Sequence, residues 1–326
     1  MPSKPGWCHE DLHMRIFLAG ATGAVGKHLV PLLREAGHVV VGTTRSPGKA
    51  DHLKAQGVQP QILDALDREA TVRAVVAARP DAIVHQLTAI PANLNLRRFD
   101  REFALTNRLR TEGTDNLLAA ARAAGVRRVV AQSFAGWTYE RAGGSVKTEN
   151  DPLDPEPPPA FRRTLDAIRY LEAALQAAEG IETIALRYGW FYGPGTSLGR
   201  GAALLDAIRR RQFPIVGSGT GVWSFLHIAD AAGATVAALE RGAPGIYNVA
   251  DDEPAPVCEW LPFLANATGA PPPRRVPSWL ARLLIGRHGE VLMSENRGFS
   301  NRKAKSALDW RPRHASWRTG FINGLG

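Results

Sequence analysis

The chain of 326 residues has little cysteine and no long hydrophobic run. Its 2 cysteines, Cys8 and Cys258, exclude a disulfide scaffold and a cysteine-rich metal site, and we expect no bound metal. No apolar stretch approaches the ~20 residues that a helix needs to cross a membrane, so we expect no membrane partner. Residues 1–13 lack the apolar core of a signal peptide and are expected to be a loose extension, with Met14 as an alternative start. These features predict a cytoplasmic protein.

Lysine is also scarce, since only 7 of the 40 basic residues are lysines. The net charge of +9 would suit a nucleic-acid partner. The arginines are scattered, however, with a single run from Arg209 to Arg211, and no nucleic-acid-binding motif accompanies them. We therefore expect no nucleic-acid partner, and an anionic cofactor or substrate accounts for any functional part of the charge.

Apolar segments of strand length alternate with helical patterns as far as Tyr188, which predicts an α/β fold with a Rossmann-type, doubly wound parallel sheet. The expected strands are Arg15–Ala19, His38–Thr43, Val58–Leu63, Ala82–Leu87, Arg127–Ser133 and Thr183–Tyr188, and the expected helices are Val25–Ala36, Arg68–Ala78, Phe103–Ala124 and Phe161–Ala178. The segment 143–159 has 5 prolines and is expected to be either an active-site loop or a solvated connector. Glycine, proline and aromatic residues then predict a smaller C-terminal substrate-binding lobe. The expected division is a dinucleotide-binding domain of residues 14–188 and 223–250, and a substrate lobe of residues 189–222 and 251–326.

A glycine-rich turn follows the first expected strand and precedes an amphipathic helix. It reads Gly20-Ala21-Thr22-Gly23-Ala24-Val25-Gly26. Glycines allow a tight turn and a close backbone approach to a pyrophosphate, and the helix N-terminus offers free N–H groups. An ordinary glycine-rich turn is the alternative, but the strand before it and the helix after it favour a dinucleotide site. The expected cofactor residues here are Gly20, Thr22, Gly23, Val25 and Gly26.

The second strand ends in Thr44-Arg45, without the acidic residue that would bind a ribose 2′-hydroxyl. A guanidinium at this place can bind a 2′-phosphate, so we expect NADP, with NAD less favoured; a surface arginine in a loop is the alternative. Asp64 ends the third strand and is placed to meet the adenine amine, unless it only caps the next helix. The remaining expected cofactor residues are Ala65, Leu87 and Thr88.

These motifs, in this order, resemble the extended short-chain dehydrogenases/reductases of the NAD(P)-dependent epimerase/dehydratase group. Beside the glycine turn and Asp64, the resemblance rests on the segments at Ile83–Thr88, Glu112–Leu118, Val129–Ser133, Leu186–Gly195, Phe225–Asp230, Gly245–Val249 and Leu308–Pro312. It implies hydride transfer at a nicotinamide and a catalytic set of Ser or Thr, Tyr and Lys. It also implies a homodimer formed through the two long helices Phe103–Ala124 and Phe161–Ala178.

The catalytic set is where this sequence departs from the family. Ser133, at the carboxyl end of its strand, matches the family serine that hydrogen-bonds the reacting oxygen. No tyrosine in the chain has a lysine four residues later. Alignment on Glu172 instead puts Thr164 at the tyrosine position and Ile168 at the lysine position.

Another proton donor is therefore expected. Tyr188 ranks first, because it ends a strand at the carboxyl edge of the sheet, where open α/β folds bind ligands. Structural packing of Tyr188 is the alternative. The other candidates are Tyr139 and Lys147 in the loop after Ser133, while His85 is interpreted as a core histidine.

Tryptophans near these loops predict an aromatic-lined pocket for a flat or apolar substrate, with packing between lobes as the alternative. The expected substrate residues are Trp137, Tyr139, Thr164, Trp190 and Trp223. The expected function is an NADP-dependent oxidoreductase or epimerase that acts by hydride transfer on a small, aromatic or apolar carbonyl or alcohol. The alternatives are a cofactor-binding sensor or regulator with little catalysis, and a nucleotide-sugar epimerase or dehydratase with a relocated acid.

Overall fold

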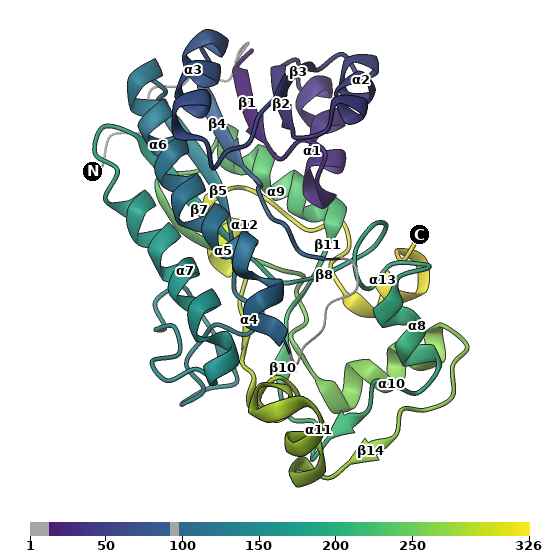
Figure 1. Ribbon diagram of the computed structural model, residues 1–326. Helices are drawn as coiled ribbons and strands as arrows, with labels where there is room; N and C mark the ends of the chain where they lie inside the picture. The colour runs from purple at the N-terminus through teal and green to yellow at the C-terminus, as the bar shows by residue number, and fades with distance from the viewer. Residues whose placement is uncertain (1–12, 92–97) are drawn as a thin grey trace.

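The computed structural model describes residues 13–91 and 98–326. A seven-stranded sheet forms its centre, with the strand order β12-β7-β5-β4-β1-β2-β3 and parallel pairing throughout (Figure 1). The strands are β1 (Arg15–Ala19), β2 (Val39–Thr44), β3 (Gln59–Ile62), β4 (Ala82–His85), β5 (Arg128–Phe134), β7 (Glu182–Tyr188) and β12 (Gly245–Val249). The predicted doubly wound α/β fold is confirmed.

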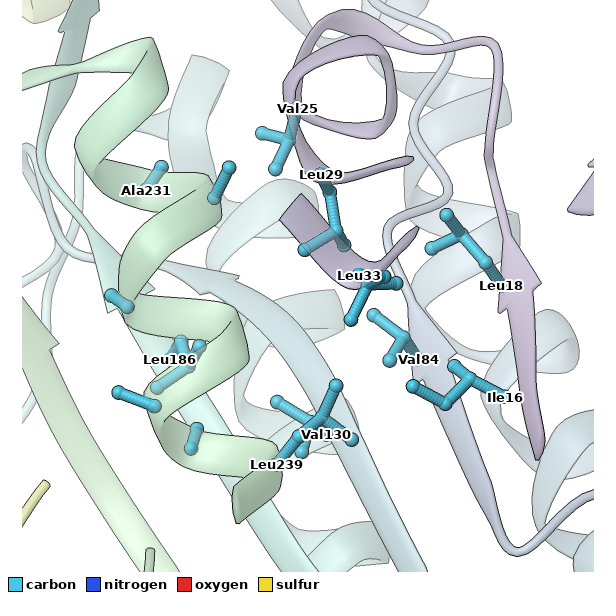
Figure 2. Packing of buried hydrophobic residues seen from close by; sticks show 14 of the residues in the cluster. Ile16, Leu18, Val25, Leu29, Leu33, Val84, Val130, Leu186, Ala231 and Leu239 are labelled. Atoms are coloured by element: carbon cyan, nitrogen blue, oxygen red, sulfur yellow. The ribbon is translucent and has the colours of Figure 1, made fainter. Parts of the chain in front are cut away.

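Helices cover both faces of this sheet (Figure 1). One face carries α1 (Ala24–Glu35) and α9 (Ile228–Glu240), the other carries α3 (Arg68–Ala78), α6 (Glu112–Ala124) and α7 (Pro159–Gln176), and α2 (Pro47–Ala55) connects β2 to β3. Figure 2 shows Val25, Leu29 and Leu33 of α1 packed between the sheet and α9. Because both faces are covered, the central strands β1 and β4 are continuous apolar runs rather than alternating ones, whereas the edge strand β3 is more polar and exposed.

The predicted helix Phe103–Ala124 is not a single helix. The structure has α4 (Phe99–Glu102), α5 (Ala104–Arg110) and then α6, with a break at Thr111. Thr111 has a ψ of −82°, and its hydroxyl donates a 3.1 Å hydrogen bond to the carbonyl of Asn107. A threonine hydroxyl bonded to the carbonyl four residues earlier bends a helix, which the apolar spacing of the sequence does not reveal.

A second lobe lies beyond the lower end of the sheet in Figure 1. Its strands are β8 (Trp190–Tyr192), β9 (Ile215–Val216), β10 (Val222–Trp223), β11 (Phe225–His227), β13 (Ala255–Pro256) and β14 (Arg275–Val276). Its helices are α8 (Ala203–Arg209), α10 (Val257–Ala267), α11 (Ser278–Glu290), the π-helical η2 (Val291–Glu295) and α13 (Trp317–Asn323), while α12 (Arg302–Ala307) packs with the core of the sheet. No helix in the described part of the chain is long and apolar enough to cross a membrane.

The proline-rich segment 143–159 contains β6 (Val146–Lys147), which pairs with β15 (Gly298–Phe299) near the C-terminus. Lys147 is 4% exposed, and its ammonium donates to the carbonyl of Ala142 at 2.6 Å and pairs with Asp151 at 3.5 Å. The pairing of β6 with β15 fastens the segment to the C-terminal part of the chain, and the local contacts leave Lys147 in a structural position.

Candidate active site

A cavity of about 280 Å³ opens at the carboxyl end of the sheet. It lies where β1 pairs with both β2 and β4, the point at which the strand order reverses and open α/β sheets bind ligands. Nine of the expected cofactor residues line it: Gly20, Thr22, Gly23, Thr44, Arg45, Asp64, Ala65, Leu87 and Thr88. The structure therefore brings together in space residues from four separate strand ends.

The glycine turn has the shape that a dinucleotide needs. Gly20 has a φ of +97°, and a Cβ atom on it would lie 2.7 Å from the carbonyl oxygen of Gln86. Gly23, which lines the cavity, is also the N-cap of α1, and no side chain caps the helix there. These residues fit the pyrophosphate of NAD(P), because the backbone can approach it closely and the helix dipole favours an anion.

Two of the expected cofactor residues do not line the cavity. Val25 is 4% exposed and packs in the core below the turn (Figure 2). Gly26 packs against the backbone of Gly20 and Ala21, where a Cβ atom would clash. Both residues therefore pack against the core or the backbone of the glycine turn rather than facing the cavity.

The far end of the cavity carries two cations. Arg45 lines it beside Ser46, and Lys49, in the first turns of α2, lines it as well. The hydroxyl of Thr44 accepts a hydrogen bond of 3.2 Å from the Ser46 amide and so shapes this rim. Sequence reasoning missed Lys49; its signal is a basic residue at the start of the helix after the second strand.

Asp64 also lines the cavity, and its carboxylate accepts a 3.1 Å hydrogen bond from the Leu66 amide. Asp67, three residues later, is the residue that caps α3, because it accepts a 2.9 Å bond from the Ala70 amide. Asp64 is thus free of the capping role that was its alternative interpretation.

A buried ionic network lies beside the end of β5. The hydroxyl of Ser133 donates to the Glu172 carboxylate at 2.7 Å, and Arg187 donates to the same carboxylate at 2.8 and 2.6 Å. Tyr139 links to the network, because its hydroxyl accepts from Arg187 at 3.0 Å and donates to Asn248 at 2.7 Å. All five side chains are buried. The Ser133 proton therefore points to a protein carboxylate rather than toward a substrate.

Tyr188 lies on the other face of the sheet. Ser133 pairs with Arg187 across β5 and β7, so the next residue along, Tyr188, points to the face of α9. Its hydroxyl contacts Thr235 of α9 at 2.6 Å and accepts from Gln86 at 3.1 Å. The structure does not bring Tyr188 and Ser133 together, and this placement favours a structural role for Tyr188.

Thr164 lies at the interface of α5 and α7, where its hydroxyl accepts a 3.1 Å hydrogen bond from Asn107. Ile168, one turn later on α7, is fully buried. Packing and hydrogen bonding thus hold both of these α7 side chains in place. His85 is 2% exposed and lies against Thr114 at 3.2 Å, as expected of a core histidine.

The pKa of every tyrosine hydroxyl is raised above its ordinary value. The chain has 5 tyrosines. Burial raises the pKa of Tyr139 and of Tyr188 to about 12. Burial also raises the pKa of Tyr192 and Tyr247, and the hydrogen bond to Asp115 raises that of Tyr170.

Aromatic side chains gather between the end of β5 and the second lobe. Trp137 stacks on Phe161 with ring centres 4.2 Å apart, and Phe99 packs against both. Trp190 stacks on Trp223 at 4.2 Å, and their ring N–H groups donate to the carbonyls of Gly136 and Leu292. The second pair has satisfied polar groups and joins the lobes, whereas Trp137 packs with Phe99 and Phe161.

His227, Asp230 and His314 have ligand-type atoms within 4.8 Å of one another. Several of their polar atoms already have partners, since Asp230 accepts from the His314 amide and ring at 2.9 Å, and His227 lies 3.1 Å from the Gly324 carbonyl. The group fastens the C-terminal segment to α9.

The family follows from comparison with known proteins. The model of the NAD dependent epimerase/dehydratase family matches residues 16–250. The chain belongs to this family. It is accordingly an enzyme of an oxidoreductase and epimerase family, as the motifs predicted, with an NAD(P)-binding Rossmann domain.

Relatives within the epimerase/dehydratase family include reductases and epimerases. A 3-diazoavenalumate denitrifying reductase from a Streptomyces species is 45% identical over 311 residues, which cover 94% of this chain and 99% of the relative. A 4-hydroxy-2-methyl-3-oxo-4-farnesyl-3,4-dihydroquinoline-1-oxide ketoreductase from Stigmatella aurantiaca is 30% identical, over 78% of this chain and 74% of the relative. The structure of Thermus thermophilus UDP-glucose 4-epimerase in complex with NAD is 26% identical, with a TM-score of 0.72 and coverage of 96% and 98%.

Proposed function

We propose that this chain is an NADP(H)-dependent reductase that transfers a hydride to a flat aromatic substrate without a proton-donating tyrosine. The observation that carries the proposal is that no tyrosine in the chain has a lysine four residues later, together with the raised pKa of the phenols described above. The family resemblance assigns the tyrosine position to Thr164. A phenol with a raised pKa gives up its proton less readily, and a threonine hydroxyl is a still weaker acid. The reaction that suits this site is one that needs no proton at the reacting centre.

Loss of dinitrogen from an aryl diazonium ion meets that requirement. The carbon–nitrogen bond breaks and its electron pair leaves with N₂, while the hydride supplied by the reduced nicotinamide provides both electrons of the new carbon–hydrogen bond. One NADPH and one diazonium ion give one arene, one N₂ and one NADP⁺, and no proton is consumed. The 45% identical relative, a denitrifying reductase of a diazo compound, supports this substrate class over the carbonyl or alcohol suggested by the sequence.

The residues of the chain have separate tasks in this reaction. The backbone at Gly20 and Gly23 would hold the pyrophosphate, and Arg45 and Lys49 would hold a 2′-phosphate, which supports NADP over NAD. The aromatic group around Trp137 would bind a flat ring and exclude water from the reacting carbon.

The test uses the full chain with NADPH and a ring-substituted benzenediazonium salt. We expect oxidation of NADPH with equal release of N₂, and transfer of deuterium from C4-deuterated NADPH to the arene carbon. Reactions without enzyme, and with an Arg45→Ala/Lys49→Ala variant, correct for direct reduction by the cofactor. Turnover of the matched benzaldehyde, but not of the diazonium salt, would overturn the proposed substrate class.

Two other results would favour the alternative functions. Binding of NADPH without oxidation by any substrate would indicate a sensor. Conversion of UDP-glucose without net consumption of cofactor would indicate a nucleotide-sugar epimerase. Either result contradicts the proposed reductase.

A further inference from the structure

A buried guanidinium, one nitrogen of which has no hydrogen-bond partner among the described residues, ends α5. Arg110 is 4% exposed, and its Nη1 atom has no hydrogen-bond partner among the described residues. Burial lowers the pKa of Arg110 to about 10, although the negative charge of Glu172 acts to raise it. The side chain therefore keeps its positive charge at neutral pH. Burying a charge without a hydrogen-bonding partner is costly, and a bound ligand would offset that cost.

Arg110 ends a helix, α5, that packs on α7. Asn107, one turn before Arg110, donates to Thr164 of α7 at 3.1 Å. Thr164, Ile168 and Glu172 follow at intervals of four residues, so they share one face of α7. On α5, Arg110 follows Asn107 by one turn, as Ile168 follows Thr164 on α7. The negative charge of Glu172 raises the pKa of Arg110.

The Glu172 carboxylate does not satisfy this guanidinium. Its oxygens accept one hydrogen bond from Ser133 and two from Arg187. Arg187 thus neutralises Glu172, and the Arg110 charge remains available to another group.

The same end of α5 borders the cofactor cavity. Leu109, the residue before Arg110, lines that cavity. The charge of Arg110 also acts on His85, which directly precedes the cavity-lining residues Gln86, Leu87 and Thr88. Thr114 connects the two elements, because its hydroxyl donates to the Arg110 carbonyl at 2.7 Å and lies 3.2 Å from the His85 ring.

We propose that Arg110 binds the adjacent hydroxyls of the ribose on the nicotinamide side of the cofactor. A guanidinium presents its N–H donors in a planar fork, which suits two neighbouring oxygen acceptors. A donor from α5 would thus replace the cation that the family resemblance assigns to α7, where this chain has Ile168. The proposal rests on cofactor binding as described under the proposed function, but not on the identity of the substrate.

The test compares two ligands that differ in this ribose. NADPH contains it, whereas adenosine 2′,5′-bisphosphate carries the 2′-phosphate end and lacks it. Titration calorimetry on the full chain with Arg110→Met is expected to show NADPH binding at least tenfold weaker and bisphosphate binding within twofold of the unchanged chain. Arg110→Lys is expected to recover part of the NADPH affinity. Arg122→Met, at an exposed arginine near the end of α6, is the matched control and is expected to change neither.

Three results would overturn the proposal. These are unchanged NADPH affinity in Arg110→Met, an equal loss for both ligands, and a raised KM for the substrate at unchanged NADPH affinity. If Arg110→Met does not fold, the unchanged chain decides the question with an NADP analogue that lacks the 2′-hydroxyl of the nicotinamide ribose. We expect this analogue to bind about tenfold more weakly than NADP, and equal binding would overturn the proposal. NADPH binding without diazonium turnover would contradict the proposed reaction and leave this inference standing.

Discussion

The hydroxyl of Ser133 donates a 2.7 Å hydrogen bond to the carboxylate of Glu172, a residue of the facing helix α7. Arg187 donates two further hydrogen bonds to the same carboxylate. The hydroxyl proton of Ser133 therefore takes part in a buried ionic network. A serine that holds the oxygen of a carbonyl substrate must donate to it. The Ser133–Glu172 hydrogen bond therefore differs from the catalytic arrangement that is expected from the sequence, in which Ser133 binds the reacting oxygen.

Ser133→Ala is expected to destabilise the protein more than it slows the reaction. The buried carboxylate loses one charged hydrogen bond, which contributes about 1.5–3 kcal/mol to the free energy of unfolding. Chemical denaturation measures this loss, and kcat with NADPH and the diazonium salt is expected to stay within about threefold. A fall in kcat of more than a hundredfold at unchanged cofactor affinity would restore Ser133 to the reacting centre.

Tyr188→Phe is expected to retain kcat. The hydroxyl contacts Thr235 at 2.6 Å and Gln86 at 3.1 Å, on the side of the sheet away from Ser133. Its removal leaves two buried polar groups with fewer partners and lowers the free energy of unfolding by about 1–3 kcal/mol. Tyr247→Phe, which removes a hydroxyl bonded to the Ala243 carbonyl, is the matched control. Loss of turnover in the Tyr188 variant alone would identify it as the proton donor.

Cofactor preference is expected to depend on Arg45. In Arg45→Ala, NADPH binding is expected to weaken by about ten- to a hundredfold, because a charged hydrogen bond contributes about 1.5–3 kcal/mol. NADH binding is expected to stay within about twofold, and Lys49→Ala to show a smaller loss in the same direction. Calorimetric titration measures both affinities, with Arg122→Ala as the control. Equal affinities of the unchanged chain for NADPH and NADH would refute the preference.

Stability is expected to fall as the pH drops below about 6.5. Burial lowers the pKa of His85 to about 4, so the folded state holds this ring neutral while the unfolded state takes up a proton. The stabilising effect of the neutral ring is complete above pH ~6.5, and about 3 kcal/mol of it is lost on approaching pH 4. Denaturation midpoints of His85→Gln should therefore depend less on pH than those of the unchanged chain. His52→Gln, at an exposed site, is the control, and parallel curves for the His85 variant would contradict the assignment.

The homodimer that is expected from the sequence can be tested by measuring the molecular mass of the protein in solution. Tyr170 of α7 is 44% exposed and donates a 2.6 Å hydrogen bond to Asp115 of α6, so the outer faces of the two helices form one surface with an aromatic residue on it. Light scattering is expected to give about twice the chain mass of 35.3 kDa. Tyr170→Arg is expected to give monomers and Trp279→Arg, at a 66% exposed residue of α11, to leave the mass unchanged. A monomeric unchanged chain, or dissociation by the Trp279 variant alone, would exclude this interface.

Local patterns were enough to predict the sheet and the cofactor cavity. Strands buried on both faces are continuous apolar runs, and the turn from Gly20 to Gly26 lies between such a run and a helix, so both are visible in a short window. Arg45 and Asp64 could be placed because each directly follows a strand, and the carboxyl ends of parallel strands meet at one edge. Lys49 was not predicted to line the cavity, because its position there depends on where α2 begins.

The interior of the site is decided by contacts between distant segments. The side chains of Ser133, Glu172 and Arg187 meet across two strands and a helix, and nothing local to any of them specifies the partner. Tyr188 ends its strand as predicted, but the register of β5 and β7 turns it to the opposite face from Ser133. A shift of one residue reverses the face of a strand side chain, so its direction is known only once the strands are paired.

The sequence by itself therefore predicted most of the residues that line the cavity at the carboxyl end of the sheet, and it determined that no tyrosine is followed four residues later by a lysine. Only the tertiary structure decided how the helices around that place are arranged. A break at Thr111 separates α5 from α6, and α5 packs on α7, where Asn107 donates a hydrogen bond to Thr164. Helix breaks and helix contacts depend on side-chain bonds and packing over long sequence separations, which neither composition nor periodicity encodes.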